Sequence, residues 1–427
     1  MTAFDTHPMR PATIAEGVTE HAHPTDDAIL LLIPADDVVA PEISIVIPAL
    51  NEEAVIARFL EWCREGIEAA GVTAEILIID SSEDRTPEIA LAHGARVLRT
   101  PVRGLGQAYR DALPVIRGRY VIMGDADCTY DFREIAPFIE GFREGHEFVM
   151  GSRFAGTIED GAMPPLHRYF GTPFTGLILN VIYGTHFTDI HCGMRGMTTD
   201  ALKAMNLQSR SWEYASEIVV KSVRLGLKTA EVPVHFYKDR DGRVSHHKRL
   251  GWFSPWHAGW INLRAMLIHG ADFFVIKPGV VLLVIGLLTT ILLAGGPVTL
   301  GPVTLSLNSM MLGSTLTIVG MQSVFLGGMA RTLYDPSGRS GERWRARFPY
   351  TRMMIVSGML WLLGFGLAYT FLDAYISSGF TTTMDMRAVN HRAVAGLLAI
   401  VLGFQTFVST LLLHAIVAYM PTGDSSR

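Results

Sequence analysis

The chain is poor in charged residues. Only 18% of its 427 residues are Asp, Glu, Lys or Arg, whereas 49% are hydrophobic. That balance is too apolar for a purely soluble protein of this length. The net charge of −5 is mild and gives no indication of a basic nucleic-acid-binding surface, so we expect no nucleic-acid partner.

Cysteine is scarce, and no cleavable leader is expected. Cys63, Cys128 and Cys192 lie far apart without CxxC spacing, which argues against a zinc site or a disulfide framework and favours reduced thiols. The first 40 residues lack a basic segment followed by an apolar one, so they do not resemble a signal peptide. We expect residues 1–40 to form a disordered N-terminal tail.

The first half of the chain alternates short apolar runs with helical patterns. The runs at 43–48, 75–80, 95–100, 120–125 and 147–152 are typical of buried parallel strands, with helical stretches between them. This alternation predicts an α/β domain over residues 41–245, built as a Rossmann-like, mostly parallel sheet with helices on both faces.

The second half contains long apolar runs. Each can supply the roughly 20 residues that cross a bilayer, and buried helices of a soluble domain are disfavoured because charges are almost absent from the runs. We predict an α-helical transmembrane domain over 273–420 with four spans, followed by a cytoplasmic tail over 421–427. The spans lie at about 278–297, 308–330, 353–372 and 393–420.

Loop charge predicts the orientation of these spans. Residues 331–352 hold six arginines, whereas the loop near 298–307 has no charge. By the positive-inside rule the arginine-rich loop is cytoplasmic, which places both termini and the α/β domain in the cytoplasm. We expect a multi-pass protein of the cell membrane.

Residues 246–272 join the two halves. Trp252, Trp256 and Trp260 recur every four residues, so on a helix they share one face. This spacing favours interfacial amphipathic helices at headgroup depth. A tryptophan stripe packed on the α/β core is the alternative.

Polar residues follow three of the predicted strands. In an open parallel sheet, ligands bind beyond the carboxyl ends of the strands. "PALNEE" (48–53) follows the first strand and "DSSEDRT" (80–86) ends the second. Asp80 and Asp84 could bond a ribose or a base edge, although Asp, Asn and Ser are also ordinary turn formers.

Asp125 and Asp127 follow the fourth strand in "GDADCTYD" (124–131). Two carboxylates at a strand end can hold one Mg²⁺ or Mn²⁺ whose other ligands are water and phosphate oxygens. Such a cation would neutralise a diphosphate leaving group. A solvated turn is the alternative reading of the pair.

A glycine-rich stretch and several basic residues complete the set. "RGLGQA" (103–108) lacks a dinucleotide or P-loop pattern, so either close approach to a nucleotide or a plain helix start explains Gly104 and Gly106. Arg153, Arg195 and the basic stretch 238–248 suit a phosphate, or are ordinary surface arginines. His246 and His247 could be general bases, but interfacial charge is the favoured reading.

These motifs together resemble one family: the family-two GT-A glycosyltransferases that act on polyprenyl or dolichyl phosphates, such as dolichyl-phosphate mannose and glucose synthases. The motifs "SIVIPALNEE", "IIDSSEDRT", "GLGQAYRDAL", "MGDADCTYD", "GSRF", "DIHCGMRG", "WEYASEI" and "DRDGRVSH" occur in the family's order over about 200 residues. The four-span tail resembles that of a subgroup with a C-terminal membrane domain.

The resemblance implies site residues and a reaction. A hexose would pass, with inversion, from a nucleotide diphosphate sugar (UDP-glucose or GDP-mannose) to the phosphate of a polyprenyl or dolichyl lipid in the bilayer. Asp125 and Asp127 would hold Mg²⁺ or Mn²⁺ and act in catalysis with Arg153 and Arg195. The nucleotide pocket would be lined by Pro48, Leu50, Asn51, Glu52, Asp80, Ser82, Asp84, Gly104, Gly106, Gln107 and Asp125. The acceptor phosphate would be bound by Arg153, Asp189, Arg195, Arg240 and Ser245.

The sequence departs from the family pattern at three positions. Ser81 replaces an acid after the second strand, which bears on base specificity. Cys192 replaces a serine and His246 a lysine, which bear on acceptor binding.

Two rival functions remain open, and the resemblance also leaves open a homo-oligomer. A processive polysaccharide synthase would carry a QxxRW element, but Ser340 stands where Gln should precede Arg343 and Trp344. A non-catalytic membrane scaffold that binds sugar nucleotide is the alternative from another class, and the intact aspartate pair argues against it.

Overall fold

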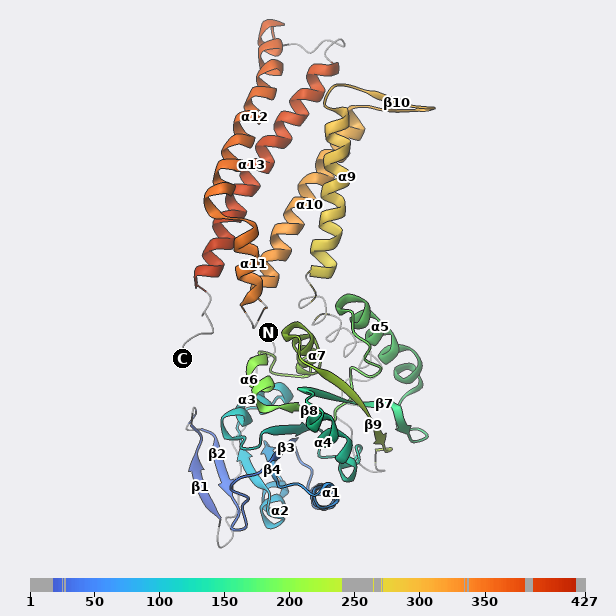
Figure 1. Cartoon of the computed structure of the whole chain (residues 1–427), viewed down its shortest axis with the longest axis vertical. Coiled ribbons are helices and arrows are strands. Elements are labelled where there is room, and N and C mark those ends of the chain that lie inside the picture. Colours follow the sequence, from blue (N-terminus) through green and yellow to red (C-terminus); the bar gives the residue numbers. More distant parts are fainter. Residues whose placement is uncertain are drawn as a thin grey trace. The chain divides into compact units, whose positions relative to one another are not determined.

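The computed structural model divides the chain into two compact units, residues 1–266 and 267–427 (Figure 1). It describes residues 18–24, 26, 28–239, 264, 270, 272–333, 335, 338–380 and 387–419. Most of the predicted interfacial segment 246–272 lies outside the described residues, as do Arg240 and Ser245.

Unit 1 is built on a nine-stranded mixed sheet. Strands β2 and β8 run against the other seven, because each pairs antiparallel with both of its neighbours, while the remaining pairs are parallel. All five predicted strands are present. In sheet order the strands are β1 (Thr19–Ala22), β2 (Leu30–Ile33), β5 (Arg96–Arg99), β4 (Ala74–Asp80), β3 (Ile43–Ala49), β6 (Tyr120–Met123), β8 (Arg195–Thr198), β7 (Phe148–Ile158) and β9 (Thr229–Phe236).

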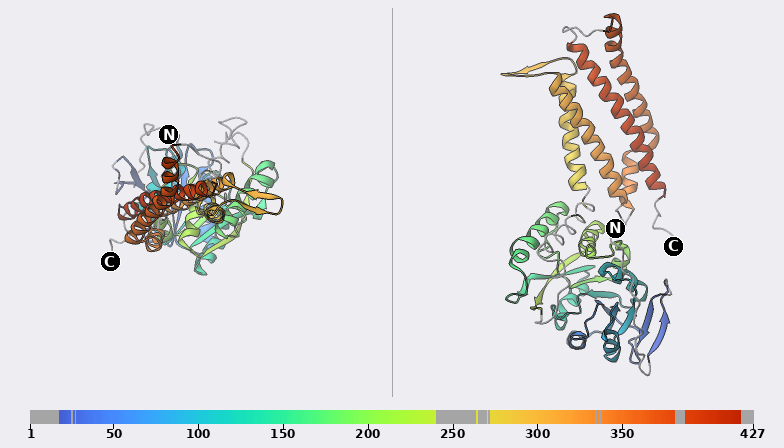
Figure 2. Two further views of the ribbon diagram at one scale, coloured as in Figure 1. Left: turned by 90° about the horizontal axis from the view of Figure 1, so that it is seen from above. Right: turned by 180° about the vertical axis from the view of Figure 1, so that it is seen from behind.

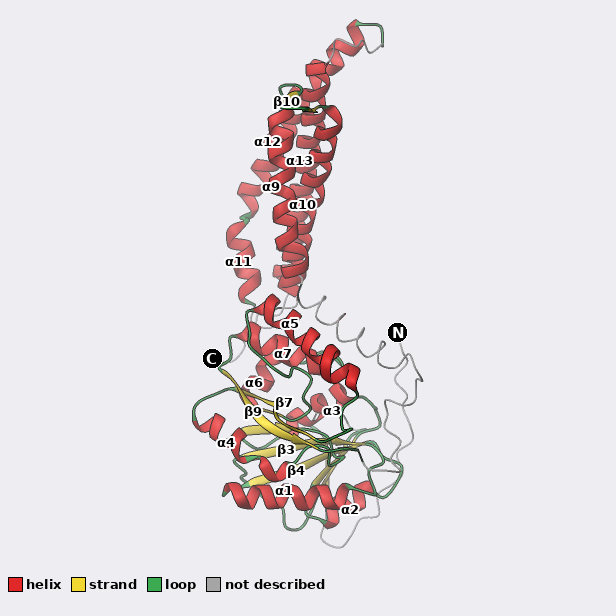
Figure 3. Cartoon of the chain, turned by 90° about the vertical axis from the view of Figure 1, so that its right-hand side faces the viewer, coloured by secondary structure: helices red, strands yellow, loops and turns green. Residues whose placement is uncertain are grey.

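Helices cover both faces of this sheet (Figure 3). Helix α1 shows why: Ile56, Phe59, Leu60 and Cys63 recur at helical spacing and all are buried. Helix α1 contacts α2 and α4 on its side of the sheet, whereas α3 and α6 contact α7. The helices are α1 (Ile56–Ala70), α2 (Thr86–Ala92), α3 (Leu105–Ala112), α4 (Ala136–Arg143), α5 (Thr172–Tyr183), α6 (Thr199–Met205) and α7 (Tyr214–Leu225).

The ordered part of unit 1 begins earlier than expected. Strands β1 and β2 form one edge of the sheet, with Leu31 of β2 opposite Leu98 of β5, and Leu31 and Leu32 are buried. The expectation of a disordered tail through residue 40 is therefore wrong for the described residues from 18 onward. The physical reason is the apolar run "ILLLI" at 29–33, which gains free energy by pairing with β5.

Unit 2 is helical and holds four candidate spans, the number that the sequence predicts. Four helices are long and apolar enough to cross a membrane: Phe273–Leu293, Leu307–Leu333, Tyr350–Ser377 and Asn390–Tyr419. They fall in α9 (Lys277–Leu293, preceded by the π-helical turn Asp272–Ile276), α10 (Leu307–Leu333), α12 (Tyr350–Ser377) and α13 (Arg387–Tyr419). Two short elements were not predicted, the hairpin β10 (Val298–Leu300)–β11 (Val303–Leu305) and α11 (Arg339–Arg347).

The spans pack as two helical pairs, α9 with α10 and α12 with α13 (Figure 2). Small residues let the backbones approach. A Cβ on Gly364 of α12 would lie 2.7 Å from the Gly396 carbonyl oxygen of α13, and a Cβ on Gly396 would lie equally close to the Gly364 oxygen. This reciprocal contact is the close packing that glycines permit between membrane helices.

Candidate active site

The aspartate pair lies directly beyond β6, as predicted. Strand β6 ends at Met123, and a Cβ on Gly124 would lie 2.5 Å from the Phe132 ring, so only glycine fits there. Asp125 and Asp127 are both half-buried. Asp127 accepts hydrogen bonds from the Thr129 N–H (3.0 Å) and hydroxyl (2.6 Å), which forms a tight turn. The carboxylates are thus held in a defined loop.

The loops after β3 and β4 are tied to each other. Ala49 pairs with Asp80 in the sheet, which brings the two loops together. The Asn51 N–H donates to Ser82 Oγ (2.7 Å), and Asn51 Oδ1 accepts from the Glu83 N–H (2.9 Å). Asn51 has a φ of 56°, a left-handed conformation that Asn tolerates. The predicted nucleotide-binding residues of these loops form one rim beside β6.

Other polar groups of this rim also form hydrogen bonds within and between the two loops. The Glu52 N–H donates to Thr86 Oγ1 (2.9 Å), and Asp84 accepts from the N–H (2.9 Å) and hydroxyl (2.6 Å) of Thr86. Asp84 therefore shapes the start of α2. These hydrogen bonds are enough to explain why polar residues occur in these loops, without a ligand. The role of Asp84 toward a ribose or base therefore stays a prediction.

Asp80 lies beneath the rim. Its side chain is fully buried and pairs with Arg99 of β5, and it also accepts from the Ser82 N–H (3.3 Å). Burial raises the pKa of Asp80, although the Arg99 guanidinium opposes that shift. Its Oδ1 atom has no hydrogen-bond partner among the described residues, a costly state for a buried carboxylate oxygen.

The glycines of "RGLGQA" are explained by packing. A Cβ on Gly104 would lie 2.4 Å from the Arg210 carbonyl oxygen, and one on Gly106 would lie 2.3 Å from the Ser209 oxygen. The Gln107 N–H donates to that same Arg210 oxygen (3.0 Å). The plain structural reading of this helix start is therefore sufficient, and a nucleotide contact of Gly104, Gly106 or Gln107 stays a prediction.

Arg153 and Asp189 form a buried bidentate ion pair. Arg153 Nε and Nη2 donate to the two Asp189 oxygens at 2.6 and 2.9 Å, and the Arg153 N–H adds a third bond at 3.1 Å. Burial alone would raise the pKa of Asp189, but the Arg153 guanidinium outweighs it and the pKa is lowered. The two charges largely cancel, so Arg153 is less exposed to an anion than the sequence suggested.

Arg195 lies deeper than the sequence indicated. It is only 1% exposed and donates to three main-chain oxygens, those of Cys192 (2.8 Å), Ala215 (2.8 Å) and Ile190 (3.3 Å). Arg195 thus fastens the 190–195 turn to the first turn of α7. Its predicted contact with phosphate would require those bonds to be exchanged.

Tyr130 joins the acidic and the basic parts of the site. Its hydroxyl accepts from the Gly193 N–H (2.8 Å), and a Cβ on Gly193 would lie 2.6 Å from Asp125 Oδ2. Burial raises the pKa of Tyr130, Arg153 opposes the shift, and Asp125 and Asp189 reinforce it. Tyr130 therefore feels the charges of the aspartate pair and of the buried ion pair at once.

The tyrosines around the aspartate pair were not predicted from the sequence. The Tyr109 hydroxyl donates to the Gly124 oxygen (3.3 Å), and the Tyr109 and Tyr214 ring centroids are 5.1 Å apart. Burial raises the pKa of Tyr214 to about 12, with the Asp125 carboxylate adding to the rise. Single tyrosines carry no spacing signal. Only the place of Tyr130 and Tyr214 inside the motifs "MGDADCTYD" and "WEYASEI" could have pointed to them.

His191 is a second missed residue. It hydrogen-bonds through Nε2 to the Thr175 hydroxyl of α5 (2.9 Å). Burial lowers its pKa to about 4, although Asp189 opposes the shift, so the imidazole is neutral near pH 7.

The donor set restricts the cations that the aspartates could hold. Among the described residues no group of three or more His, Cys, Asp or Glu side chains is placed to bind a metal. Two carboxylates suit Mg²⁺ or Mn²⁺, which can take their remaining ligands from water and phosphate, and do not suit a structural zinc ion. The residues therefore fit the predicted cation class.

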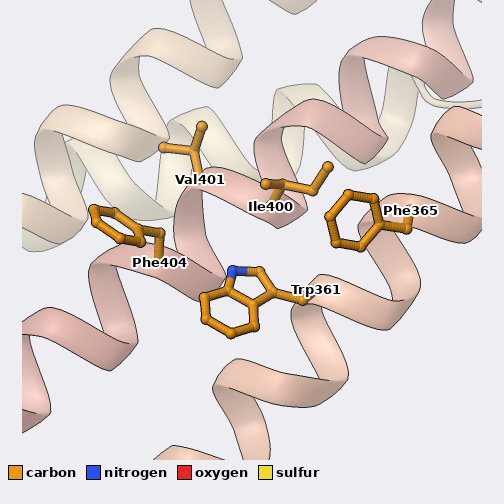
Figure 4. Close-up of a pocket in the computed structure, with 5 residues that line it drawn as sticks. All are labelled: Trp361, Phe365, Ile400, Val401 and Phe404. Atoms are coloured by element: carbon orange, nitrogen blue, oxygen red, sulfur yellow. The ribbon is translucent and has the colours of Figure 1, made fainter.

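A separate cavity lies in unit 2. It has a volume of about 600 Å³ and is lined by Trp361 and Phe365 of α12 with Ile400, Val401 and Phe404 of α13 (Figure 4). The indole N–H of Trp361 is the one polar donor among these side chains. Such a lining cannot hold a nucleotide or a phosphate, so this cavity is distinct from the candidate active site.

Comparison with known proteins agrees with the two-unit division. Residues 44–205 match the family described as glycosyl transferase family 2, and residues 328–417 match its C-terminal transmembrane region. The chain is 33% identical over 414 residues to the low-salt glycan biosynthesis hexosyltransferase Agl6 of Haloferax volcanii. The match covers 96% of each chain. It is also 28% identical over 203 residues to a dolichyl-phosphate hexose transferase of the same organism, covering 48% of this chain and 86% of that protein.

Among solved structures, the chain is similar to glucosyl-3-phosphoglycerate synthase from Mycobacterium tuberculosis in complex with Mn²⁺, UDP and glucosyl-3-phosphoglycerate. The identity is 22%, the TM-score is 0.42, and the match covers 54% of this chain and 80% of that one. The mixed sheet and the family match identify unit 1 as the predicted GT-A fold.

Proposed function

Because the chain belongs to glycosyltransferase family 2, we propose that it transfers a hexose from a nucleotide diphosphate sugar to the phosphate of a dolichyl or other polyprenyl lipid. The names of two relatives support this acceptor, a dolichyl-phosphate hexose transferase and a dolichyl-phosphate β-glucosyltransferase of Trichomonas vaginalis, 30% identical over 214 residues. Membership of the family makes the chain a glycosyltransferase and sets aside the non-catalytic scaffold.

The observation that carries the proposal is the fold of the 189–195 turn over Asp125. Gly193 of this turn contacts both Tyr130 and Asp125, and the same turn carries Asp189, the partner of Arg153, which supports the proposal. A diphosphate donor and an anionic acceptor would both need to bind there. One region offers carboxylates for a cation, and the other holds the Arg153 guanidinium, which is paired with Asp189.

Transfer of the sugar to a phosphate requires no strong general base from the protein. A phosphate monoester has a second pKa of about 6, so the acceptor oxygen is already ionised near neutral pH. That oxygen would attack the anomeric carbon, the bond from this carbon to the diphosphate would break, and the configuration would invert. Three buried tyrosines, Tyr109, Tyr130 and Tyr214, border this region.

Positioning and charge would supply most of the rate. A divalent cation held by Asp125 and Asp127 would supply positive charge for the departing diphosphate. The rim formed by Asn51, Ser82 and Asp84 would hold the nucleotide, and Arg153 would orient the acceptor phosphate. We further propose that the sugar donor is UDP-glucose or GDP-mannose.

The membrane unit fits a lipid acceptor that stays in the bilayer. The four candidate spans make the chain a membrane protein. We propose that it lies in the cell membrane with unit 1 and both termini in the cytoplasm, since the arginines of 331–352 favour that side. A homo-oligomer stays a prediction.

A transfer assay tests the proposed function. The purified chain in liposomes is given polyprenyl phosphate, Mn²⁺ and one of UDP-glucose, UDP-galactose, GDP-mannose or UDP-N-acetylglucosamine, and lipid-linked sugar is measured. We expect one donor to be consumed, and Asp127→Asn to lower the rate at least a hundredfold. Glu134→Gln, an exposed position in the following turn, serves as the control. Transfer by Asp127→Asn at the wild-type rate would show that the aspartate pair is not part of the machinery.

A further inference from the structure

A polar residue lies on the exposed side of α10, near the middle of a candidate membrane span. The span runs from Leu307 to Leu333, and Gln322 lies close to its centre and is exposed. No hydrogen bond joins the Gln322 side chain to another residue of the described structure. A side-chain amide is costly in hydrocarbon, because lipid tails offer it no hydrogen bond. The position of Gln322 therefore calls for a polar partner inside the membrane.

Other side chains of the spans do not raise this problem. The hydroxyls of Thr290 and Thr317 donate to main-chain oxygens one turn earlier in their own helices, at 2.9 and 2.8 Å. Every exposed residue of α9 between positions 280 and 292 is Val, Leu or Ile. Gln405 of α13, the other glutamine in the spans, is half-buried. Away from the helix ends, Gln322 is thus the exposed amide of the described spans.

The exposed residues of α10 recur with a period of seven positions. Polar residues form one series with this spacing, and apolar residues form a second series between them, while Met311 is exposed beside the two series. Steps of three and four residues in alternation are the contact pattern of a left-handed pair of helices. We call these positions the α10 seam: Asn308, Thr315 and Gln322 in the polar series, and Leu312, Val319, Leu326 and Leu333 in the apolar series.

The α10 seam is separate from the faces that α10 uses inside unit 2, where it contacts α9 and α13 (Figure 2). A Cβ on Gly320 would lie 2.6 Å from the Gly279 oxygen of α9, and Phe325 clusters with Leu413 of α13. By helical geometry these two faces and the seam are each about a third of a turn apart. The seam is therefore a third face of α10, which stays exposed in the described structure.

A second copy of the chain fits this face better than lipid does. Copies inserted in the same orientation present parallel α10 helices, and a two-fold axis along the membrane normal brings identical positions face to face. A glutamine side chain both donates and accepts hydrogen bonds, so two Gln322 amides can bond each other. Lipid tails can pack on Leu312 or Val319 but leave the amide without a partner.

We propose that two copies of the chain pair through the α10 seam as a parallel, left-handed pair of helices in the bilayer, with their Gln322 side chains hydrogen-bonded to each other. The amide pair would also fix the register. A shift of one copy by one turn would place Gln322 opposite Val319 or Leu326 and leave both amides in hydrocarbon. The proposal concerns unit 2 alone and does not depend on the proposed function.

Disulfide cross-linking of the full chain in liposomes tests the pairing. The three native cysteines are buried in unit 1, so a disulfide between copies reports an added cysteine. Val319→Cys and Leu326→Cys place a thiol on the seam, and Leu288→Cys places one on the exposed face of α9 as a matched control. Each purified variant is reconstituted at a low ratio of protein to lipid and oxidised with copper phenanthroline, and the rate of dimer formation is read from a non-reducing gel.

We expect the variants at 319 and 326 to cross-link about tenfold faster than the variant at 288, because contact positions of a helix pair come within disulfide distance. Adding Gln322→Leu to Leu326→Cys should slow cross-linking about fivefold or more, since the amide pair is lost. Leucine is favoured in lipid, so this change does not oppose insertion of α10. Gln405→Leu, which removes the half-buried glutamine, should leave the rate unchanged.

Two results would overturn the proposal. Equal rates at the seam and at 288 would mean that the copies meet only by random collision, and that lipid or another protein covers the seam. A rate at 326 that Gln322→Leu leaves unchanged would show that the amides do not contact each other.

Discussion

At the scale of single residues, the candidate site is organised by buried pairs rather than by exposed charges. Asp189 and Arg195 are buried and the Arg153 side chain is only 10% exposed, and each uses its polar atoms on neighbouring groups. Buried charges are costly unless they are paired, so removing one partner is more damaging than removing an exposed charge. The same pairs fix the position of the 189–195 turn.

Asp189→Asn leaves Arg153 buried without its counter-charge. We expect the free energy of unfolding to fall by about 3–5 kcal/mol at pH 7, the usual cost of breaking a buried ion pair. Thermal or urea unfolding of the full chain in detergent measures this change. The exposed pair Arg85–Glu53 provides the control: Glu53→Gln should cost less than about 1 kcal/mol.

The pH dependence of this difference follows from the lowered pKa of Asp189. A carboxyl whose native pKa lies below its unfolded value of about 3.9 stabilises the fold fully above that value and loses the stabilisation as the pH falls through the native pKa. The gap between wild type and Asp189→Asn should therefore stay constant from pH 5 to 7 and narrow below about pH 4. A gap that widened on acidification would contradict the ionised pair.

Tyr130→Phe tests the link between the two parts of the site. The change removes the acceptor of the Gly193 N–H and frees the turn over Asp125, so we expect kcat/KM for sugar transfer to fall about tenfold or more. Tyr237→Phe also removes a tyrosine hydroxyl, one that donates to Asp131 and accepts from Arg133 outside the turn. Similar activity losses in both variants would argue that stability alone is responsible.

At the scale of elements, long apolar patterns were predictable and short ones were not. Strands β3, β4 and β6 and the four spans follow from apolar runs whose length and flanks leave few alternatives. Strand β8 was missed because "RGMT" has four residues and begins with an arginine, and only its neighbours in the sheet bury it. Strand β2 was missed because the acidic residues around it suggested a tail.

The same contrast applies to the site. Its loops were predictable because the ligand-binding residues of an open α/β sheet lie beyond the carboxyl ends of the strands. The residues that lie in such loops are Asn51, Asp84, Asp125 and Asp127. Depth was not predictable: Arg195 looks like a phosphate ligand in sequence, yet its guanidinium binds main-chain oxygens in the interior. Buried arginines are rare, so sequence reasoning places them on the surface by default.

Two glycines of α12 provide a matched test of helix packing. A Cβ on Gly364 would lie 2.6 Å from an Ile400 side-chain carbon and 2.7 Å from the Gly396 oxygen, whereas one on Gly366 would meet nothing within 4 Å. We expect Gly364→Ala to cost about 1–3 kcal/mol in the stability of unit 2. Gly366→Ala should be neutral or slightly stabilising, because Ala favours the helix. Thermal unfolding in detergent compares the two, and equal effects would contradict the packing.

At the scale of the whole molecule, the two units have separate cores and are expected to unfold separately. Urea should unfold the α/β unit while the helices of unit 2, held in detergent, resist. A nucleoside diphosphate added with Mn²⁺ should raise the urea midpoint of the α/β unit alone. At a nucleotide concentration a hundred times its dissociation constant, the free energy of unfolding of that unit should rise by about 2.7 kcal/mol. Circular dichroism and limited proteolysis follow the two transitions, and a shift without added cation would argue against the proposed metal.

The position of β8 bears on how the chain is made. Strand β8 pairs with both β6 and β7, so the β7–β9 half of the sheet cannot join the β3–β6 half until residues 195–198 have left the ribosome. Until then β6 is an open edge, the kind of surface that other chains can join. During synthesis there is therefore a stage at which β6 has formed but β8, the strand that pairs with it, has not yet been made. The apolar stretch of α5 leaves the ribosome during this same stage.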